Sequence, residues 1–477
     1  MTRLRAMRRQ AWLCSIYGTT ARILFIAAAV CSFICTKSHA QDLTFSVSPS
    51  PVGSGARAAG MADAFVAVAD DATAASWNPA GLVQLERPEI SIVGQYNRIW
   101  EKFESGMHPE TDSTHRSDEL ALNFLSVAYP LPTLPGGRNA TISLNYQRKY
   151  DFTRKFDTRF QTSFLLPSGS TADQLQEIRF DQTGGLSAIT PAFAIELTHK
   201  LSIGVAVNLW GSSFLADSGW EQDLRIHSTT TVPGNPSVES DIIQQEDYDS
   251  FRGENVVVGV LWSVTPRWNI GLRYDSGFTA DTNYHVESNF GDSQEDREVR
   301  FPSTLAIGAA FRANDRFTLS MDISRTDWDN FYVRKQNGDK FSLVDGSTDL
   351  ADPTQAGEMT DFDPTITVRL GAEYVFIPKI KSEALPALWS LRGGLVYDQE
   401  PASGRQDPST GSSNGTPDSF YGATAGVGVL VGQHVNFDFA YQVRYGPDVN
   451  RDYIRGISGF KEDFVQHRLL FSMVVYF

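Results

Sequence analysis

Apolar and polar residues alternate with a period of two along several segments of the chain. In residues 201–209 every odd position is apolar and every even position is small or polar. Residues 317–324 and 435–445 follow the same pattern. Because successive side chains of a β-strand point to opposite faces, this period predicts strands that each carry one apolar face.

The connections between such segments fall into two length classes that take turns along the chain. Short turns are predicted at residues 135–137, 199–200, 266–267, 314–315, 378–386 and 432–433. Long polar stretches are predicted at residues 104–118, 153–185, 213–250, 282–299, 331–361, 401–418 and 447–461. This count gives about fourteen antiparallel strands, and an even number puts both barrel ends on the short-turn side.

Short turns on one rim and long loops on the other are typical of an outer-membrane β-barrel. A secreted β-sandwich also alternates, but it would have to hide the apolar face of every strand in one core. We therefore expect an all-β, transmembrane antiparallel β-barrel that crosses the bacterial outer membrane many times.

The last predicted strand alternates up to the C-terminal residue. Phe471, Met473, Val475 and Phe477 share one face of it. This ending resembles the C-terminal assembly signal of bacterial outer-membrane barrels, which implies the barrel-assembly machinery as a partner. The alternative is a strand that happens to end the chain.

Residues 1–40 have the layout of a secretory signal peptide, with arginines before an apolar run at 23–35 and small residues up to Ala40. We expect removal after Ala40, and an uncleaved anchor is the alternative. All three cysteines lie in this segment, so the mature chain can form neither a disulfide nor a thiolate metal site. Without its six basic residues, 35 basic residues face 56 acidic ones, a net charge of −21 that argues against nucleic acid as a partner.

Residues 41–88 do not alternate and are rich in glycine and alanine. We expect compact loops and short helices there. A fourteen-stranded barrel is too wide for its own side chains to fill, so this segment is predicted to plug the lumen as a hatch. The predicted organisation is a signal at 1–40, a hatch at 41–88 and a barrel at 89–477.

Residues 60–65 (Gly-Met-Ala-Asp-Ala-Phe), 69–72 (Ala-Asp-Asp-Ala) and 77–81 (Trp-Asn-Pro-Ala-Gly) resemble the hatch of the FadL/TodX family. Residues 302–331 and 391–401 are similar to strands of that family. The resemblance implies passive uptake of hydrophobic small molecules, such as long-chain fatty acids, other lipids or hydrocarbons. It further implies a pocket above the hatch, hatch rearrangement, and lateral escape through a gap in the wall.

Several hatch residues are implied in gating by this resemblance. They are Phe45, Gly60, Asp63, Asp70, Asn78, Pro79 and Ala80. We expect Asn78 to bond nearby backbone in a rigid turn that holds the hatch closed, leaving Phe45 free to sense ligand. Similar hatches occur in PorV-type barrels of protein secretion machinery, so a protein-binding barrel is the alternative function. A general porin is disfavoured because a plug would block bulk flow.

Charged residues recur on the polar faces of the predicted strands, where only a wet or paired interior tolerates them. They are Arg273, Asp275, Asp322, Arg369, Glu373, Arg392, Asp438 and Arg444. Ion pairs that brace the wall are one interpretation, and a substrate carboxylate held by one of the arginines is the other. The acidic outer stretches lack metal-loop spacing, so no metal ion is predicted.

No motif for catalysis is found, since the sequence lacks Gly-x-Ser-x-Gly, His-Glu-x-x-His and a phosphate-binding glycine loop. His434 and Asp438 share a strand face, but four residues along a strand span about 13 Å, too far for a hydrogen bond. We therefore expect neither an enzyme nor a cofactor. The expected partners are a hydrophobic ligand, outer-membrane lipid and lipopolysaccharide.

Overall fold

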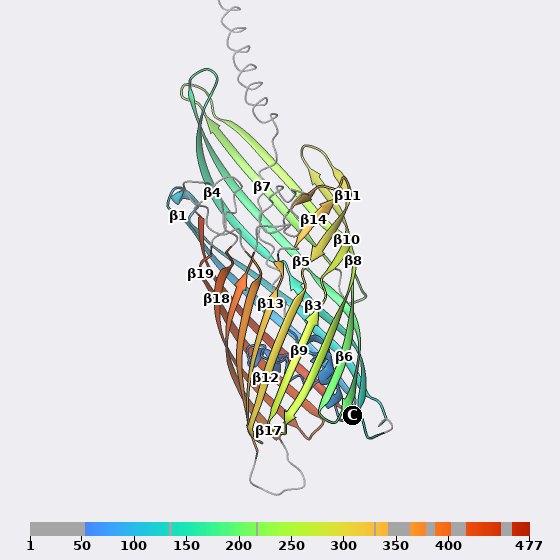
Figure 1. Cartoon of the computed structure of the whole chain (residues 1–477). Coiled ribbons are helices and arrows are strands. Elements are labelled where there is room, and N and C mark those ends of the chain that lie inside the picture. The colour runs from blue at the N-terminus through green and yellow to red at the C-terminus, as the bar shows by residue number, and fades with distance from the viewer. Residues whose placement is uncertain are drawn as a thin grey trace, which may run out of the picture. The chain divides into compact units, whose positions relative to one another are not determined.

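A computed structural model describes residues 53–132, 136–215, 218–328, 331–341, 363–377, 387–401, 416–449 and 460–477. The expected signal peptide and Phe45 lie outside these residues. The described strands form a single sheet of twenty (Figure 1). Within the described ranges, no helix is both long enough and apolar enough to cross a membrane.

Fourteen of the strands form a closed antiparallel ring, as predicted. They are β1 (Glu89–Ser105), β2 (Ser113–Pro130), β3 (Ala140–Asp151), β5 (Thr171–Thr198), β6 (Leu201–Trp210), β8 (Val238–Thr265), β9 (Trp268–Asp275), β12 (Thr304–Asn314), β13 (Phe317–Thr326), β16 (Thr365–Phe376), β17 (Ala387–Glu400), β18 (Asp418–Val431), β19 (Val435–Val449) and β20 (Phe460–Tyr476). The ring closes where β1 pairs with β20, from Glu89 opposite Tyr476 to Ser105 opposite Phe460.

The short turns lie where the sequence predicts them. Residues 199–200 join β5 to β6, residues 266–267 join β8 to β9, and residues 432–434 join β18 to β19. The predicted connection at 378–386 lies outside the described residues. Both ends of the ring lie at this rim, because the amide of Phe477 donates to the carbonyl of Pro88 at 3.0 Å.

The prediction that the long polar stretches are loops is wrong for much of their length. They contain β4 (Arg154–Leu165), β7 (Gly219–Thr231), β10 (Phe278–Ser288), β11 (Ser293–Phe301), β14 (Tyr332–Lys335), β15 (Lys340–Phe341) and the first halves of β5 and β8. The sequence between β1 and β2 is short and includes a 3-10 turn, η2 (Pro109–Thr111). These strands alternate too, but their outer positions are charged, so the segments look polar on average.

The extra strands continue the wall on one side, above the ring (Figure 1). Their pairing order is β4, β5, β7, β8, β10, β11, β14 and β15. We call this sheet the extension. Its inward side carries a cluster of buried aromatic residues that includes Trp220, Tyr248, Phe251 and Phe301.

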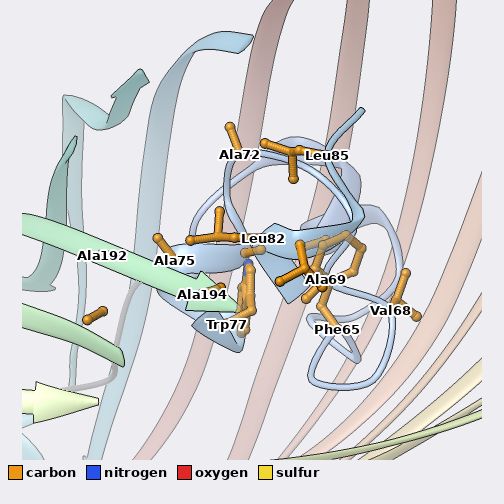
Figure 2. Packing of buried hydrophobic residues seen from close by; sticks show 14 of the residues in the cluster. Phe65, Val68, Ala69, Ala72, Ala75, Trp77, Leu82, Leu85, Ala192 and Ala194 are labelled. Atoms are coloured by element: carbon orange, nitrogen blue, oxygen red, sulfur yellow. The ribbon is translucent and has the colours of Figure 1, made fainter. Parts of the chain in front are cut away.

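Residues 53–85, which we call the inner segment, form short helices joined by turns: α2 (Ala56–Gly60), α3 (Ala74–Trp77) and η1 (Pro79–Gln84). Nearly all of these residues are buried. Figure 2 shows Trp77 and Leu82 of this segment packed with Ala192 and Ala194 of β5. At its beginning, the amide of Ala56 donates to the Ser472 hydroxyl on β20 at 2.7 Å.

Candidate functional site

A chain of ion pairs joins α2 to the ring strands on one side of the lumen. Arg57 pairs with Asp70 in the inner segment and with Glu373 of β16 at 3.0 Å. Arg392 of β17 continues the chain, 2.7 Å from Glu373 and 2.6 Å from Asp438 of β19. Burial lowers the pKa of Arg57, but Asp70 and Glu373 outweigh it and raise that pKa well above its usual value. The guanidinium therefore stays charged and keeps α2 tied to the wall.

Asn78 joins the inner segment to the opposite side of the ring. Its side-chain amide donates to the carbonyls of Val66, at 2.8 Å, and of Val260 on β8, at 3.0 Å. Its side-chain oxygen accepts from the amide of Ala80 at 3.1 Å. The predicted bonding of Asn78 to nearby backbone is therefore confirmed, and its role in gating stays a prediction.

Gly60, Asp63 and Ala80 also contact the ring, whereas Asp70 is held by Arg57 within the inner segment. The carbonyl of Gly60 accepts from the Thr424 hydroxyl of β18 at 2.9 Å. Asp63 accepts from the side chain of Gln442 of β19 at 3.2 Å. The carbonyl of Ala80, next to Pro79, accepts from the Ser202 hydroxyl of β6 at 3.0 Å.

Between the inner segment and the extension lies a cavity of about 140 Å³. One part of its wall is aromatic, with Tyr150, Trp210, Phe278 and Trp328 among the lining residues. The Trp210 and Phe278 rings stack at 5.2 Å between centroids, and Phe278 stacks on Phe301 at 4.8 Å. These stacked rings lead from the cavity into the aromatic cluster of the extension.

The rest of the cavity wall is charged. Arg273 donates to its neighbour Asp275 at 2.8 Å, and Asp322 accepts from the amide of Val66 at 2.8 Å. Lys149, which is 8 % exposed, and Arg369 also line the cavity. Neither forms an ion pair or a hydrogen bond with any residue that the structure describes. Among the described residues, these two cations thus face a small space that Asp275 and Asp322 also line, without a direct ion pair to either carboxylate.

The charged residues predicted to face the lumen fall into three groups. Arg273, Arg369 and Asp322 line the cavity. Arg392 and Asp438 belong to the ion-pair chain that holds α2. Arg444 lies further along β19 and pairs with Asp398 at 2.9 Å and with Glu400 at 2.5 Å.

Lys149 is a site residue that the sequence reasoning missed. The pairing of β3 with β5 shifts by one residue between Arg148 and Tyr150. This bulge lets the neighbouring residues Lys149 and Tyr150 both line the cavity, which a regular strand would not allow. Two adjacent charged residues inside an otherwise alternating strand were the available signal.

Three residues of the expected assembly signal lie on the outward face of β20, and the fourth, Phe477, directly follows it. These three stand opposite β1 and β19, with Phe471 paired to Gly94 and Phe439. Phe471 and Phe477 are 51 % and 64 % exposed on the outside of the wall, as expected of side chains that face lipid. Their role in assembly stays a prediction.

The backbone ladder between β2 and β3 is incomplete. It runs only from Phe124 opposite Gln147 to Pro130 opposite Thr141. Above Phe124, β2 pairs with β1 alone. Across this break, Arg148 pairs with Glu119 of β2 and also donates to the carbonyl of Gly184 at 2.9 Å. Side chains rather than backbone hydrogen bonds therefore close the wall here.

The chain is similar to known proteins in sequence and in structure. The sequence matches the family model described as outer membrane protein transport protein (OMPP1/FadL/TodX) over residues 44–451. No curated protein sequence matches the chain. A solved structure of a Pseudomonas aeruginosa FadL homologue is similar, with a TM-score of 0.54, 13% identity, and coverage of 89% of this chain and 98% of that one. A deltaS2 mutant of the TodX monoaromatic hydrocarbon channel has a TM-score of 0.54, 13% identity, and coverage of 89% and 99%.

Proposed function

Because the chain belongs to the OMPP1/FadL/TodX family of outer-membrane transport proteins, we propose that it takes up hydrophobic molecules that carry an anionic head group, such as long-chain fatty acids. Family membership implies a bacterial outer-membrane location and transport of hydrophobic compounds. The choice between a fatty acid and a neutral hydrocarbon rests on the cavity.

The observation that carries the proposal is the pair of cations, Lys149 and Arg369, beside an aromatic wall. A buried charge is costly unless an opposite charge meets it, and a hydrogen bond between ions is about twice as strong as a neutral one. A carboxylate head group would give these cations a direct ionic partner beside Asp275 and Asp322 of the same cavity wall, whereas a neutral hydrocarbon would not.

The size of the cavity limits what it holds. About 140 Å³ lies below the roughly 300–1,000 Å³ of sites that enclose a drug-sized ligand. The head group would therefore occupy the cavity, while the tail follows the stacked rings of Trp210, Phe278 and Phe301. Burial of the tail there is worth about 25 cal/mol per Å² of apolar surface.

The route follows from what blocks the lumen. The inner segment fills the ring below the cavity, so straight passage would require it to rearrange, with the Asn78 turn as the gating element. The incomplete ladder between β2 and β3 offers a sideways exit into the membrane, closed by the Glu119–Arg148 ion pair. Movement down a concentration gradient needs no energy source.

The test compares two labelled substrates, oleate and toluene, in cells that lack their own transporter. Replacing both Lys149 and Arg369 with glutamine removes the charges but keeps polar side chains of similar size. We expect oleate uptake to fall by about tenfold or more, since a hydrogen bond to a charged group contributes about 1.5–3 kcal/mol. Toluene uptake should not change.

Lys200→Gln, at an exposed turn of the opposite rim, is the matched control and should alter neither rate. Equal loss of both substrates in the double variant would assign the two cations to structure rather than selectivity. If the wild-type protein carried neither substrate, the protein-binding barrel would become the better account.

A further inference from the structure

Seven ring strands each place one glycine against the inner segment. We call these glycines the glycine belt, and they are Gly204, Gly259, Gly271, Gly308, Gly371, Gly394 and Gly426. Six of them form cross-strand pairs: Gly204 with Gly259, Gly271 with Gly308, and Gly371 with Gly394. On β13, which lacks a belt glycine, Ser320 stands opposite Gly371.

A side chain at these positions would meet the inner segment. A Cβ atom at Gly371 would lie 2.5 Å from the carbonyl oxygen of Met61, and one at Gly426 would lie 2.9 Å from the Cα of Gly60. At Gly259 it would lie 2.9 Å from Cδ of Pro79 and closer still to the Asn78 side-chain oxygen. Carbon atoms in contact are normally about 3.5–4.0 Å apart. The backbone of the inner segment therefore rests directly on the backbone of the wall.

Other strand glycines of the ring do not meet the inner segment: Gly422, Gly428 and Gly446 are crowded by atoms of the wall itself, and two others are open. A Cβ atom at Gly94 of β1 would meet nothing within 4 Å, and one at Gly393 of β17 would meet only the carbonyl of Thr424 at 3.6 Å. A glycine inside a strand gives up side-chain packing and often marks close approach by another backbone. The belt thus coincides with contact to the inner segment rather than with a general abundance of glycine.

We propose that the glycine belt sets the closed position of the inner segment, so that the size of the residue at each belt position controls how tightly the lumen is sealed. The belt contacts residues 60–67 and 78–80 of the inner segment. Ser76 and Trp77, which lie between these two ranges in sequence, line the cavity. Asn78 supplies the polar part of the same contact by donating to Val260, the residue after Gly259. The belt glycines act as positioning residues for the gate, and this role rests on the proposed function as a gated channel.

The direct test measures leak, which does not depend on what the protein transports. Wild type, Gly259→Ala and Gly204→Ala are reconstituted in planar bilayers and their ion conductance is compared. Overpacking by one methyl group should shift the closed state toward open ones, so we expect conductance to rise by about fivefold to a hundredfold. Gly94→Ala and Gly393→Ala are the matched controls and should conduct like wild type.

A chemical probe reports on the inner segment itself. The chain has no cysteine after residue 35, so Val83→Cys gives the only thiol beyond that point, at a buried position that is 5 % exposed. In the wild-type background a water-soluble maleimide should label it slowly. In the Gly259→Ala background labelling should be faster by a factor similar to the rise in conductance, while the gel shift on boiling shows a folded barrel.

A double variant separates this contact from a general loosening of the barrel. Asn78→Ala removes the oxygen that crowds position 259, so Gly259→Ala should add much less leak in that background than in wild type. If Gly259→Ala does not fold, the milder Gly426→Ala takes its place. Unchanged conductance and unchanged thiol protection in folded belt variants would overturn the proposal. Equal leak from Gly94→Ala or Gly393→Ala would also overturn it.

Discussion

The two halves of β5 present opposite surfaces although the strand keeps its even-numbered residues inward throughout. In the upper half, which belongs to the extension, Phe180 points inward and is buried while Arg179 points outward and is exposed. In the lower half, the inward residue Ala192 is small and the outward residue Phe193 is 44 % exposed. The apolar side thus changes from the inside of the wall to the outside.

β8 makes the same change. Its upper half buries Tyr248 on the inside and exposes Asp249 on the outside, whereas its lower half exposes Val258 outward and places Gly259 against the inner segment. Side-chain direction is constant along β5, whereas in β8 a bulge beside Ser250, whose φ is 53°, moves the inward side from even to odd positions. What changes is the surroundings, because the lower wall faces lipid outside while the upper wall faces water outside and its own aromatic cluster inside. The alternation therefore reports the environment of a strand as much as the strand itself.

The largest expected effect comes from removing the same side chain from each half of β5. Phe180→Ala should cost about 3–5 kcal/mol, because it leaves a hole beside Phe156 in a buried cluster. Phe193→Ala loses only a contact with lipid and should cost about 1–2 kcal/mol. The rate at which protease cleaves the β4–β5 hairpin measures the first, and urea unfolding in vesicles measures the second. Equal costs would mean that the two halves share one environment.

The second-largest difference in stability between the two halves should come from a charge placed on the outward face. Phe193→Arg puts a guanidinium into the lipid-facing band and should cost about 2–4 kcal/mol near the bilayer midplane. Leu175→Arg, also outward on β5 but in the extension, should change stability by no more than about 0.5 kcal/mol. Urea unfolding in vesicles reports on both variants. A large loss for Leu175→Arg would contradict a water-facing extension.

The smallest expected effect is a pH dependence of stability, and it is confined to the extension. His227 of β7 hydrogen bonds to Asp241 of β8 at 2.7 Å, and this bond raises the pKa of His227. A raised pKa stabilises the folded hairpin below the ordinary value of about 6.5, and that stabilisation is lost as the pH rises through the folded-state value. Protease cleavage of the β7–β8 hairpin should be slightly slower at pH 5 than at pH 8. His227→Gln should remove the difference, and a difference that persists would point to other groups.

The sequence predicts those parts of the wall whose outward face meets lipid. Alternation with an apolar outward face predicts several of the ring strands, and the count of short and long connections between them predicts fourteen. For the upper halves of β5 and β8 the sequence predicts loops, because charged outer positions such as Arg179 outweigh the buried ones in a local average. Only the assembled sheet shows that Phe180 and its inward neighbours pack against one another.

The candidate site was harder to predict for two physical reasons. Lys149 reaches the cavity through a bulge, and the only mark of it in the sequence is the adjacent charged pair Arg148 and Lys149, which does not say which of the two points inward. The belt glycines look like weak strand residues until the inner segment lies against them, because a missing side chain gives no signal of what fills its place. Asn78 was predictable because its triplet with Pro79 and Ala80 carries its own local turn chemistry.

The hydrogen bond between Ala56 and Ser472 has a consequence for the order of assembly. The two residues are 416 positions apart, so the beginning of the inner segment finds its partner only when the final strand is in place. Contacts this distant in sequence form late, since the chain loses much entropy when it brings them together. We therefore expect the inner segment to dock last, so that its alanine-rich surface stays uncovered until the ring closes.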